Sequence, residues 1–244
     1  MPGEWLCVPG EGPTCLRKGL LRRSVRWLRR VTGSVEAVTR IVAGALGGRR
    51  IAAPAGLHTR PTSDRVREAL FSTLTSLVPL RGARFADLYA GSGAVGLEAV
   101  SRGAAHVLLV ESDPKAARVI RENVALLGAA RVARPVTGKV STVLAAGPPD
   151  GQPYDVVFAD PPYAVPEQEL TAMLAALVDG GWPAADAVVV VERSSRAQPP
   201  AWADGLVAER GRRYGETTLW YGRRVYRGAR GPGLRGADEH EERA

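Results

Sequence analysis

The sequence predicts an α/β protein with a doubly wound, mostly parallel sheet that ends in an antiparallel pair of strands. From residue 84 to residue 192, short apolar segments alternate with longer segments whose apolar residues recur at helical spacing. A glycine-rich turn at 91–96 follows the first of these strand-like segments, as in many sheets of this class. Beyond residue 205, two more strand-like segments are separated only by Tyr214-Gly215, which favours antiparallel pairing.

The elements can be assigned in order along the chain. Two β-like segments, 40–43 and 49–52, flank the glycine-rich stretch 44–48 and predict a hairpin. The segment 60–71 contains candidate helix caps followed by apolar residues at helical spacing, so we expect a helix before the first core strand. The remaining expected elements are strands at 84–89, 106–111, 131–136, 154–159, 186–192, 206–212 and 216–223, and helices at 94–102, 114–127, about 139–146 and 167–178.

Composition divides the chain into three parts. Residues 1–38 form a basic extension rich in Gly, Pro and Arg that we expect to be disordered, although its stretch 16–28 also fits a basic amphipathic helix for RNA or a membrane surface. Val38 is a candidate start of the natural chain. Residues 39–225 form the expected domain, which includes the hairpin and helix of 39–78, and residues 226–244 are expected to be a disordered tail.

Composition also restricts the class of protein. The 244 residues are 45% hydrophobic, which is enough for one sizeable α/β core. Only Cys7 and Cys15 occur, so the rest of the chain has no thiol for a zinc site or a cysteine nucleophile, which fits a reducing cytoplasm. No apolar run reaches the roughly 18 residues that span a bilayer, and the motifs of serine hydrolases and P-loop proteins are absent. We therefore expect a cytoplasmic monomer that binds neither a metal nor a membrane.

The chain is strongly basic. Its net charge of +8 favours a polyanionic partner. Between residues 40 and 67 the single acid is Asp64, and we expect this segment to bind RNA. The candidate contacts are Arg40, Arg49, Arg50, Arg60 and Arg65. A basic surface that is merely solvated remains the alternative.

An acidic corner follows the strand-like segment 154–159. Asp160 precedes Pro161 and Pro162, which fix the backbone and lack an N–H, and Tyr163 comes next. The Asp160 carboxylate and the Pro161 carbonyl can accept both hydrogens of a nucleobase amino group, while Tyr163 stacks on the ring. This motif is similar to that of amino-directed methyltransferases. A simple turn is the alternative, since Asp-Pro and Pro-Pro are common in turns.

The glycine-rich turn lies upstream, between the strand-like segment 84–89 and a predicted helix. Residues 91–96 fit the pattern G-x-G-x-x-G, which by itself also permits a dinucleotide. Glu111 ends the next strand, where an acid can accept both ribose hydroxyls, although a solvated strand end is the alternative. Asp87 just before the glycines, combined with the corner at Asp160, resembles S-adenosylmethionine enzymes and not dehydrogenases.

The whole pattern resembles one family, the bacterial 16S ribosomal RNA guanine-N2 methyltransferases of the RsmD type, which modify guanine 966. The resemblance covers about residues 39–224, and its most specific part is the arginine-rich segment before the first core strand. The matching segments are 40–44, 60–71, 87–99, 101–104, 160–163 and 213–215. The family implies a class I methyltransferase fold, with five parallel strands closed by an antiparallel pair.

The resemblance implies that the cofactor is S-adenosyl-L-methionine. Its methionine part would lie against Asp87 and the glycines, and Glu111 would bind its ribose. The expected cofactor residues are Asp87, Tyr89, Ala90, Gly91, Ser92, Gly93 and Glu111. The expected catalytic residues, which would hold the guanine, are Asp160, Pro161 and Tyr163. The chain departs from the family at Gly138-Lys139, where similar enzymes commonly have an acid that contacts the adenine.

The implied function is transfer of a methyl group to N2 of a guanine, of the guanine 966 type, in 16S ribosomal RNA. The expected partner is this RNA or a small-subunit assembly particle. Two alternatives remain open. One is an amino methyltransferase acting on adenine N6 of DNA or of another RNA, and the other is a non-catalytic RNA-binding or ribosome-assembly protein on the same fold.

Overall fold

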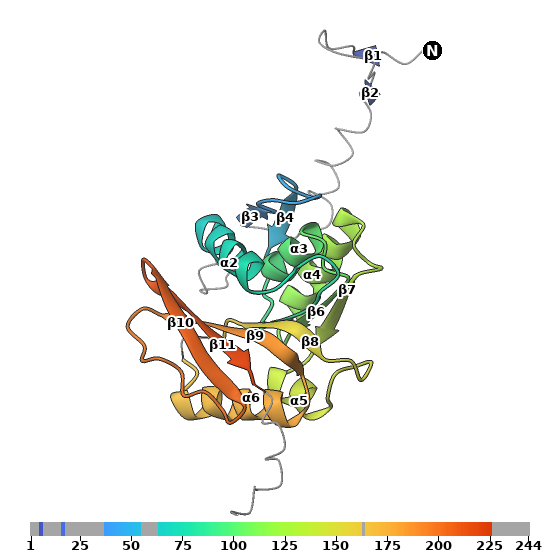
Figure 1. Ribbon diagram of the computed structural model, residues 1–244. Coiled ribbons are helices and arrows are strands. Elements are labelled where there is room, and N and C mark those ends of the chain that lie inside the picture. The colour runs from blue at the N-terminus through green and yellow to red at the C-terminus, as the bar shows by residue number, and fades with distance from the viewer. Residues whose placement is uncertain (1–4, 7–15, 18–36, 55–62, 163, 226–244) are drawn as a thin grey trace, which may run out of the picture.

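The computed structural model describes residues 5–6, 16–17, 37–54, 63–162 and 164–225, and its centre is a seven-stranded sheet (Figure 1). The strands are β5 (Arg84–Leu88), β6 (His106–Glu111), β7 (Ala133–Thr137), β8 (Tyr154–Ala159), β9 (Pro183–Ser194), β10 (Leu206–Tyr214) and β11 (Thr217–Arg224). Their order across the sheet is β10-β11-β9-β8-β5-β6-β7. The strands β5 to β9 run parallel, whereas β11 is antiparallel to both β9 and β10, which confirms the predicted fold class.

Helices cover both faces of the sheet, so its central strands are buried on both sides. One face carries α2 (Asp64–Leu77), α3 (Ala94–Ser101) and α4 (Pro114–Leu127), and the other carries α5 (Val140–Ala145) and α6 (Glu167–Asp179) (Figure 1). Successive side chains of a strand alternate between these faces. In β5, for example, Phe85 belongs to the apolar core beneath α2, α3 and α4, whereas Leu88 belongs to the core against α5 and α6.

Capping residues set the limits of the helices. Ser63 caps α2, where its hydroxyl accepts a hydrogen bond from Val66 N at 3.3 Å. Asp113 caps α4 in the same way by accepting from Lys115 N at 2.9 Å. Gly128 ends α4 with a φ of 68°, a conformation that favours glycine. The helix therefore spans the residues that the sequence predicts.

The N-terminal hairpin forms, but its first strand is not where the sequence predicts it. β3 (Ala37–Arg40) pairs with β4 (Arg50–Ala53), so the first strand lies three residues earlier than expected. Ile41 still bonds to Gly48 and Arg49 of the other arm, but the backbone of the loop residues after it bonds to α3 instead. Val42 N and Ala43 N donate to the Glu98 carboxylate at 2.6 and 2.9 Å, and Ala45 N donates to the Ser101 carbonyl at 2.8 Å.

The contact between this loop and α3 requires a glycine at position 44. Gly44 has a φ of +83°, and a Cβ atom there would clash with the Ser101 carbonyl. The Ser101 hydroxyl also accepts from Leu46 N at 2.9 Å and donates to the Ala43 carbonyl. These contacts fix the loop on α3.

The turn between β10 and β11 is shifted by one residue from its predicted place. Tyr214 pairs with Thr217, so the turn consists of Gly215 and Glu216. Gly215 adopts a φ of 62°, which glycine reaches without a steric penalty. The tight turn keeps both strands in one hairpin, and β11 lies between β10 and β9.

Little of the expected extension and tail falls within the described residues. β1 (Trp5–Leu6) and β2 (Leu16–Arg17) form a short antiparallel pair, and β3 begins at Ala37. The other residues of 1–36 and residues 226–244 lie outside the described part of the chain, as do the disorder and the basic helix expected there. None of the described helices is both long and apolar enough to cross a bilayer.

Replacing Glu98 with alanine should destabilise the domain by about 3 kcal/mol, because two backbone N–H groups and the Arg102 guanidinium lose their acceptor. Glu122→Ala is the matched control, since Glu122 also forms an i,i+4 ion pair, with the exposed Arg118. The Glu122→Ala variant should lose less than about 1 kcal/mol of unfolding free energy. Urea unfolding measures both changes, and equal losses would contradict an anchoring role for Glu98.

Candidate active site

Acidic side chains gather at the carboxyl edge of the sheet, where open α/β sheets bind ligands. The register of four neighbouring strands, β6, β5, β8 and β9, aligns one row of residues: Val110, Leu88, Ala159 and Val191. These four face α5 and α6. Successive side chains alternate between the faces, so the next residues in β6, β8 and β9, which are Glu111, Asp160 and Glu192, point to the opposite face. Asp87, which directly precedes Leu88 in β5, points to that face as well. Four carboxyl groups therefore lie on one face at one edge.

Asp87 lies buried beneath the glycine-rich loop. Its Oδ2 accepts a hydrogen bond from Gly96 N at 2.8 Å, and only 1% of the residue is exposed. Burial raises the pKa of Asp87 to about 7; the Gly96 hydrogen bond opposes this shift, while the negative charges of Glu111 and Glu192 add to it. A Cβ at residue 96 would clash with Leu109, so this close approach requires glycine. Asp87 holds the loop from below, and its contact with a cofactor stays a prediction.

Glu111 joins the end of β6 to the same loop. Its Oε2 accepts from Gly91 N at 2.8 Å, and its Oε1 accepts from Asp113 N at 2.8 Å. The residue is half-buried; Oε1 also accepts from the Ser112 hydroxyl at 3.5 Å, and Oε2 can accept a second hydrogen bond. Glu111 thus joins β6 to the glycine-rich loop, and its contact with a ribose stays a prediction.

The loop between β5 and α3 is compact. Tyr89 has a φ of 66°, which is uncommon for a residue with a Cβ, and its hydroxyl lies 3.8 Å from Met173 Sδ. The Ala90 carbonyl accepts from Gly93 N at 2.7 Å, which closes the turn before α3. A Cβ on Gly91, whose φ is +57°, would meet no atom within 4 Å. The backbone at Gly91 is therefore open to the approach of a ligand.

Asn123 supports this loop, although the sequence analysis did not single it out. It is buried in α4, where its Oδ1 accepts from Ala52 N at 2.9 Å. Its Nδ2 donates to the carbonyls of Ala52 and Ser92 at 2.8 and 3.0 Å. The residue thereby joins β4 of the N-terminal hairpin to the glycine-rich loop. The available signal was an amide on the apolar face of α4, three residues after Ile120.

Asp160 lies half-buried at the end of β8. Its backbone N faces the Leu88 carbonyl at 3.4 Å. Burial raises the pKa of Asp160 well above the usual range of an aspartate, and the charges of Glu192 and Asp87 raise it further, whereas Arg193 opposes them. The sequence predicts this residue as a functional carboxyl, and the structure gives it a strongly perturbed environment.

The corner after β8 is supported from the neighbouring strand. Arg193 is 8% exposed, and its Nη2 donates to the Val165 carbonyl at 3.2 Å and lies 3.9 Å from a Glu167 oxygen at the start of α6. Pro161 is buried. Tyr163, which the sequence analysis expects to stack on the base, lies outside the described residues.

Glu192 and Arg193 were not predicted as site residues from the sequence. Both are buried at the end of β9, with 4% and 8% of their surface exposed. The signal is a pair of charged residues directly after the four valines 188–191, at the carboxyl end of a parallel strand. Buried charges at that place are more typical of a ligand site than of a core.

The end of β7 differs from the pattern of the resembling family, as the sequence indicates. Gly138 N donates to the Glu111 carbonyl at 2.9 Å, which fixes the backbone at this position. Lys139 is exposed and precedes α5 without a capping bond from its side chain. The structure therefore places a cation here instead of an acid.

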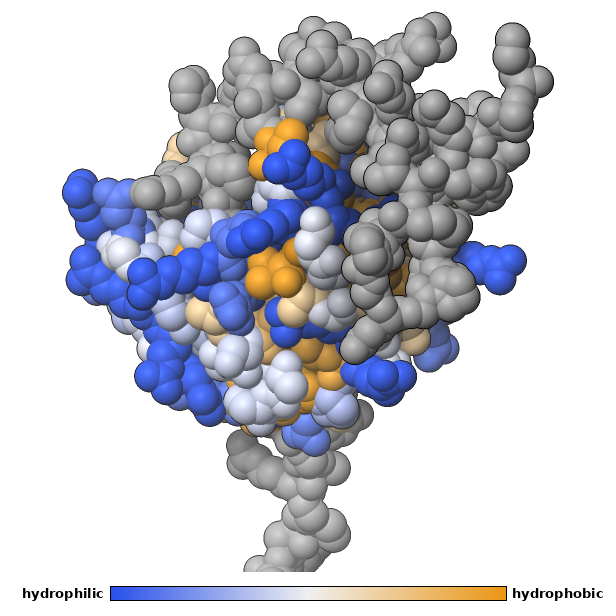
Figure 2. All heavy atoms as spheres, turned by 90° about the horizontal axis from the view of Figure 1, so that it is seen from above, coloured by the Kyte–Doolittle hydropathy of each residue, from blue (hydrophilic) through white to orange (hydrophobic). Residues whose placement is uncertain are grey.

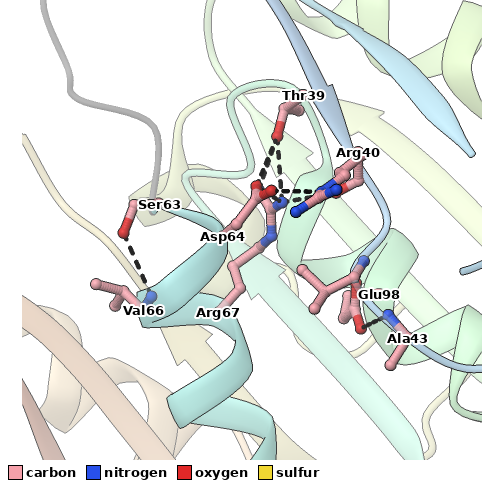
Figure 3. Close-up of polar contacts among 9 residues, drawn as sticks. Thr39, Arg40, Ala43, Ser63, Asp64, Val66, Arg67 and Glu98 are labelled. Carbon is pink, nitrogen blue, oxygen red and sulfur yellow. Dashed lines mark hydrogen bonds and ion pairs between the residues drawn. The ribbon is translucent and has the colours of Figure 1, made fainter. Parts of the chain in front are cut away.

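Part of the basic segment is used within the fold. Arg40 Nε lies 2.8 Å from Asp64 Oδ2, and the buried Arg67 places its Nη2 2.7 Å from Asp64 Oδ1 (Figure 3). Arg67 Nη2 also donates to the Arg40 carbonyl at 2.6 Å and to the Thr39 hydroxyl at 3.1 Å. Asp64 thus connects the hairpin to the first turn of α2.

The candidate RNA contacts differ in their surroundings. The side chain of Arg40 remains 64% exposed despite its ion pair. Arg49 is exposed, and its Nη2 donates to a backbone carbonyl of α4 at 2.9 Å. Arg50 and Arg65 are exposed, and Arg60 lies outside the described residues. Four of the five side chains are therefore accessible to a phosphate, and their role in RNA binding stays a prediction.

The fold and this site define the class of the protein. Five parallel strands followed by an antiparallel pair, a glycine-rich loop after β5 and an acid at the end of β6 are the arrangement of class I methyltransferases. The chain belongs to the RsmD family, since the model of that family, described as "Conserved hypothetical protein 95", matches residues 39–223. This confirms the resemblance drawn from the sequence.

Individual relatives agree with this class. A Bacillus subtilis protein named "Putative rRNA methyltransferase YlbH" is 33% identical over 178 residues, which are 73% of this chain and 95% of that protein. The "Ribosomal RNA small subunit methyltransferase D" of Escherichia coli strain K12 is 44% identical over 95 residues, which are 38% of this chain and 47% of that protein. The solved structure "Putative methyltransferase yhhF from Escherichia coli" aligns with a TM-score of 0.67 and 34% identity over 78% of this chain and 99% of that one. The protein is thus a methyltransferase.

Asp87→Asn should change the pH dependence of stability. Because folding raises the pKa of this carboxyl, the folded state binds the proton more tightly, and the wild type loses stability as the pH rises from about 4 to about 7. The variant has no charge to bury, so its stability relative to the wild type should increase over this interval, by up to about 4 kcal/mol at about 1.4 kcal/mol per pKa unit.

Urea unfolding of Asp87→Asn and wild type across this pH interval tests the prediction. The asparagine oxygen can still accept the hydrogen bond from Gly96 N, so the comparison isolates the charge. A difference in unfolding free energy that does not depend on pH would mean that Asp87 ionises normally in the fold.

Proposed function

We propose that this protein transfers a methyl group from S-adenosyl-L-methionine to the exocyclic N2 of a guanine in small-subunit ribosomal RNA, of the guanine 966 type. The observation that carries the proposal is Asp160, a half-buried carboxyl of raised pKa beside Pro161 at the acidic edge of the sheet. The names of the Bacillus and Escherichia relatives support ribosomal RNA as the substrate. We expect the protein to act as a monomer in the cytoplasm.

The chemistry of the site fits S-adenosyl-L-methionine, which supplies an activated methyl group on a sulfonium cation. The negative charge of Glu192 raises the pKa of both Asp87 and Asp160, so these carboxyl groups lie close together. Such a cluster favours the binding of a cationic ligand. Glu111 would accept the ribose hydroxyls. The open backbone at Gly91 would let the ligand approach the loop.

Asp160 would activate the target nitrogen. Guanine N2 is a poor nucleophile because its lone pair is delocalised into the ring. If the Asp160 carboxylate and the Pro161 carbonyl each accept one N2 hydrogen, they favour a pyramidal nitrogen whose lone pair can point at the methyl carbon. A cationic ligand nearby favours the ionised form of Asp160, and the raised pKa suits it to take the N2 proton as the N–C bond forms and the S–C bond breaks.

RNA must present its base unstacked for this reaction, which costs a few kcal/mol. Contacts between arginines and phosphates would offset that cost. The exposed Arg49 and Arg50 are held in a fixed position relative to the site, because Glu98 anchors their hairpin to α3 and Asn123 anchors it to the glycine-rich loop. Tyr163, outside the described residues, would add stacking on the base.

Replacing Glu111 with alanine should weaken the binding of S-adenosyl-L-methionine by about 1 to 3 kcal/mol, because the ribose hydroxyls and Gly91 N lose their acceptor. Glu111→Gln serves as the control. Its amide oxygen can still accept from Gly91 N, so its loss should be smaller. Isothermal titration calorimetry gives both affinities, and wild-type affinity in Glu111→Ala would reject the cofactor contact.

Asp160→Ala should lower the rate of methyl transfer about 100-fold or more, by analogy with the loss of one hydrogen-bond partner of a transition state. The fold and most of the cofactor affinity should remain. Asp160→Asn keeps one acceptor but cannot take a proton, so its rate separates positioning from base catalysis. The assay follows labelled methyl transfer to unmodified small-subunit ribosomal RNA and to subunit particles.

Nucleoside mass spectrometry of the methylated RNA tests the function itself. We expect N2-methylguanosine as the product. N6-methyladenosine as the sole product would favour the alternative amino methyltransferase, and cofactor binding without any transfer would favour the non-catalytic RNA-binding protein. An Asp160→Ala enzyme that turns over at the wild-type rate would remove this residue from the mechanism.

A further inference from the structure

β10 forms one edge of the sheet and is unusually exposed and basic. Its residues 207–213 are all exposed, without the alternation that a covered sheet face imposes. Arg210, Arg212 and Arg213 lie in this stretch, and 210–213 contains no acid. The strand therefore presents a row of positive charge at the margin of the protein.

Two of these arginines have no partner within the fold as far as it is described. The side chains of Arg210 and Arg212 form no hydrogen bond or ion pair with any described residue. By contrast, Arg223 in β11 pairs with Glu209, and Arg224 donates to a backbone carbonyl at 3.0 Å. Arg223 and Arg224 are thus engaged in contacts within the protein, whereas the side chains of Arg210 and Arg212 are available for a ligand.

The register of the sheet places Arg212 level with the active site. Arg212 is opposite Leu219 in β11, and Leu219 is opposite Glu192 in β9. Val191, the residue before Glu192, is opposite Ala159, the residue before Asp160. With strands about 4.8 Å apart, the backbone at Arg212 lies about 10 Å from β9 and about 14 Å from β8.

Arg210 and Arg212 also lie on the same face of the sheet as the acidic cluster. Arg210 is opposite Tyr221 and Arg212 is opposite Leu219, and both of these β11 residues belong to the core beneath α2, α3 and α4. Hydrophilic side chains gather along the side of the molecule where Figure 1 places α2 and the tip of the β10–β11 hairpin (Figure 2). An RNA strand that crosses this face from β10 would reach the corner at Asp160.

We propose that β10, through Arg210 and Arg212, is a second contact surface for the phosphate backbone of the RNA substrate, apart from the N-terminal arginines. The inference rests on the proposed function, because it takes RNA as the substrate. Guanidinium groups match phosphate in charge and geometry. A separation of about 14 Å corresponds to about four nucleotides at the 3.4 Å rise of a stacked strand. β10 would therefore hold the RNA a few nucleotides from the base that enters the site.

The test is RNA binding by the full chain with both Arg210→Gln and Arg212→Gln. An unmodified transcript of small-subunit ribosomal RNA is titrated at several salt concentrations. Each lost phosphate contact lowers the slope of log affinity against log salt by about 0.7 for a single strand, so the slope should fall in magnitude by about 1.4. The KM for RNA should rise, while kcat and the affinity for S-adenosyl-L-methionine should stay at their wild-type values.

Matched variants exclude general effects of charge and of folding. Arg131→Gln with Arg134→Gln removes two exposed arginines, one in the turn before β7 and one in β7 at the opposite edge of the sheet, and should keep the wild-type slope. Arg210→Lys with Arg212→Lys retains both positive charges and should therefore retain the wild-type salt dependence of RNA binding. If the double glutamine variant does not fold, Arg212→Gln alone replaces it, with an expected fall of about 0.7.

A slope equal to that of the β7 control overturns the proposal. Self-association of the double variant with an unchanged slope also overturns it, since the arginines would then only prevent strand pairing at an exposed edge. Failure of the proposed function is distinct, because the wild-type chain itself would then yield no methylated ribosomal RNA, whatever the slopes of the variants.

Discussion

The register of four parallel strands decides the chemistry of this protein. Because the register aligns Val110, Leu88, Ala159 and Val191 across β6, β5, β8 and β9, the residues Glu111, Asp160 and Glu192 that follow lie at one level of the sheet, and Asp87 lies two residues lower in β5. Burial of these groups together raises the pKa of Asp87 to about 7 and that of Asp160 well above its usual range. Such a cluster is unfavourable for the folded chain alone and favourable for a cationic ligand, so one electrostatic arrangement both limits stability and promotes binding.

The glycine-rich loop is held by side chains from three elements. Asp87 in β5 and Glu111 at the end of β6 accept its backbone N–H groups, and Asn123 in α4 donates to its Ser92 carbonyl. Asn123 also pairs with the backbone of Ala52 in β4. The N-terminal hairpin and the loop therefore belong to one hydrogen-bonded unit, so the surface proposed for RNA has a fixed position relative to the surface proposed for the cofactor.

Opposite charges are separated between the interior and the margin of the protein. Carboxyl groups occupy the carboxyl edge of the sheet, while exposed arginines such as Arg50, Arg65 and Arg212 lie at the periphery. A polyanion is attracted to the margin and repelled by the centre. An amino group or a sulfonium is attracted to the centre. In the described part of the chain, exposed arginines thus surround an acidic site, which suits an enzyme that binds a phosphate backbone but acts on a base.

The sequence by itself determined the succession of elements, the glycine-rich loop and the corner at Asp160, because these depend on local periodicity, on caps such as Ser63 and on the stiffness of proline. Only the tertiary structure decided which distant groups meet. The first hairpin strand lies earlier than predicted because Glu98 in α3 accepts hydrogen bonds from the loop that follows it. Glu192 belongs to the site because the register of β8 and β9 places it level with Asp160. No local pattern specifies such contacts, since their free energy arises only when segments far apart in the chain pack together.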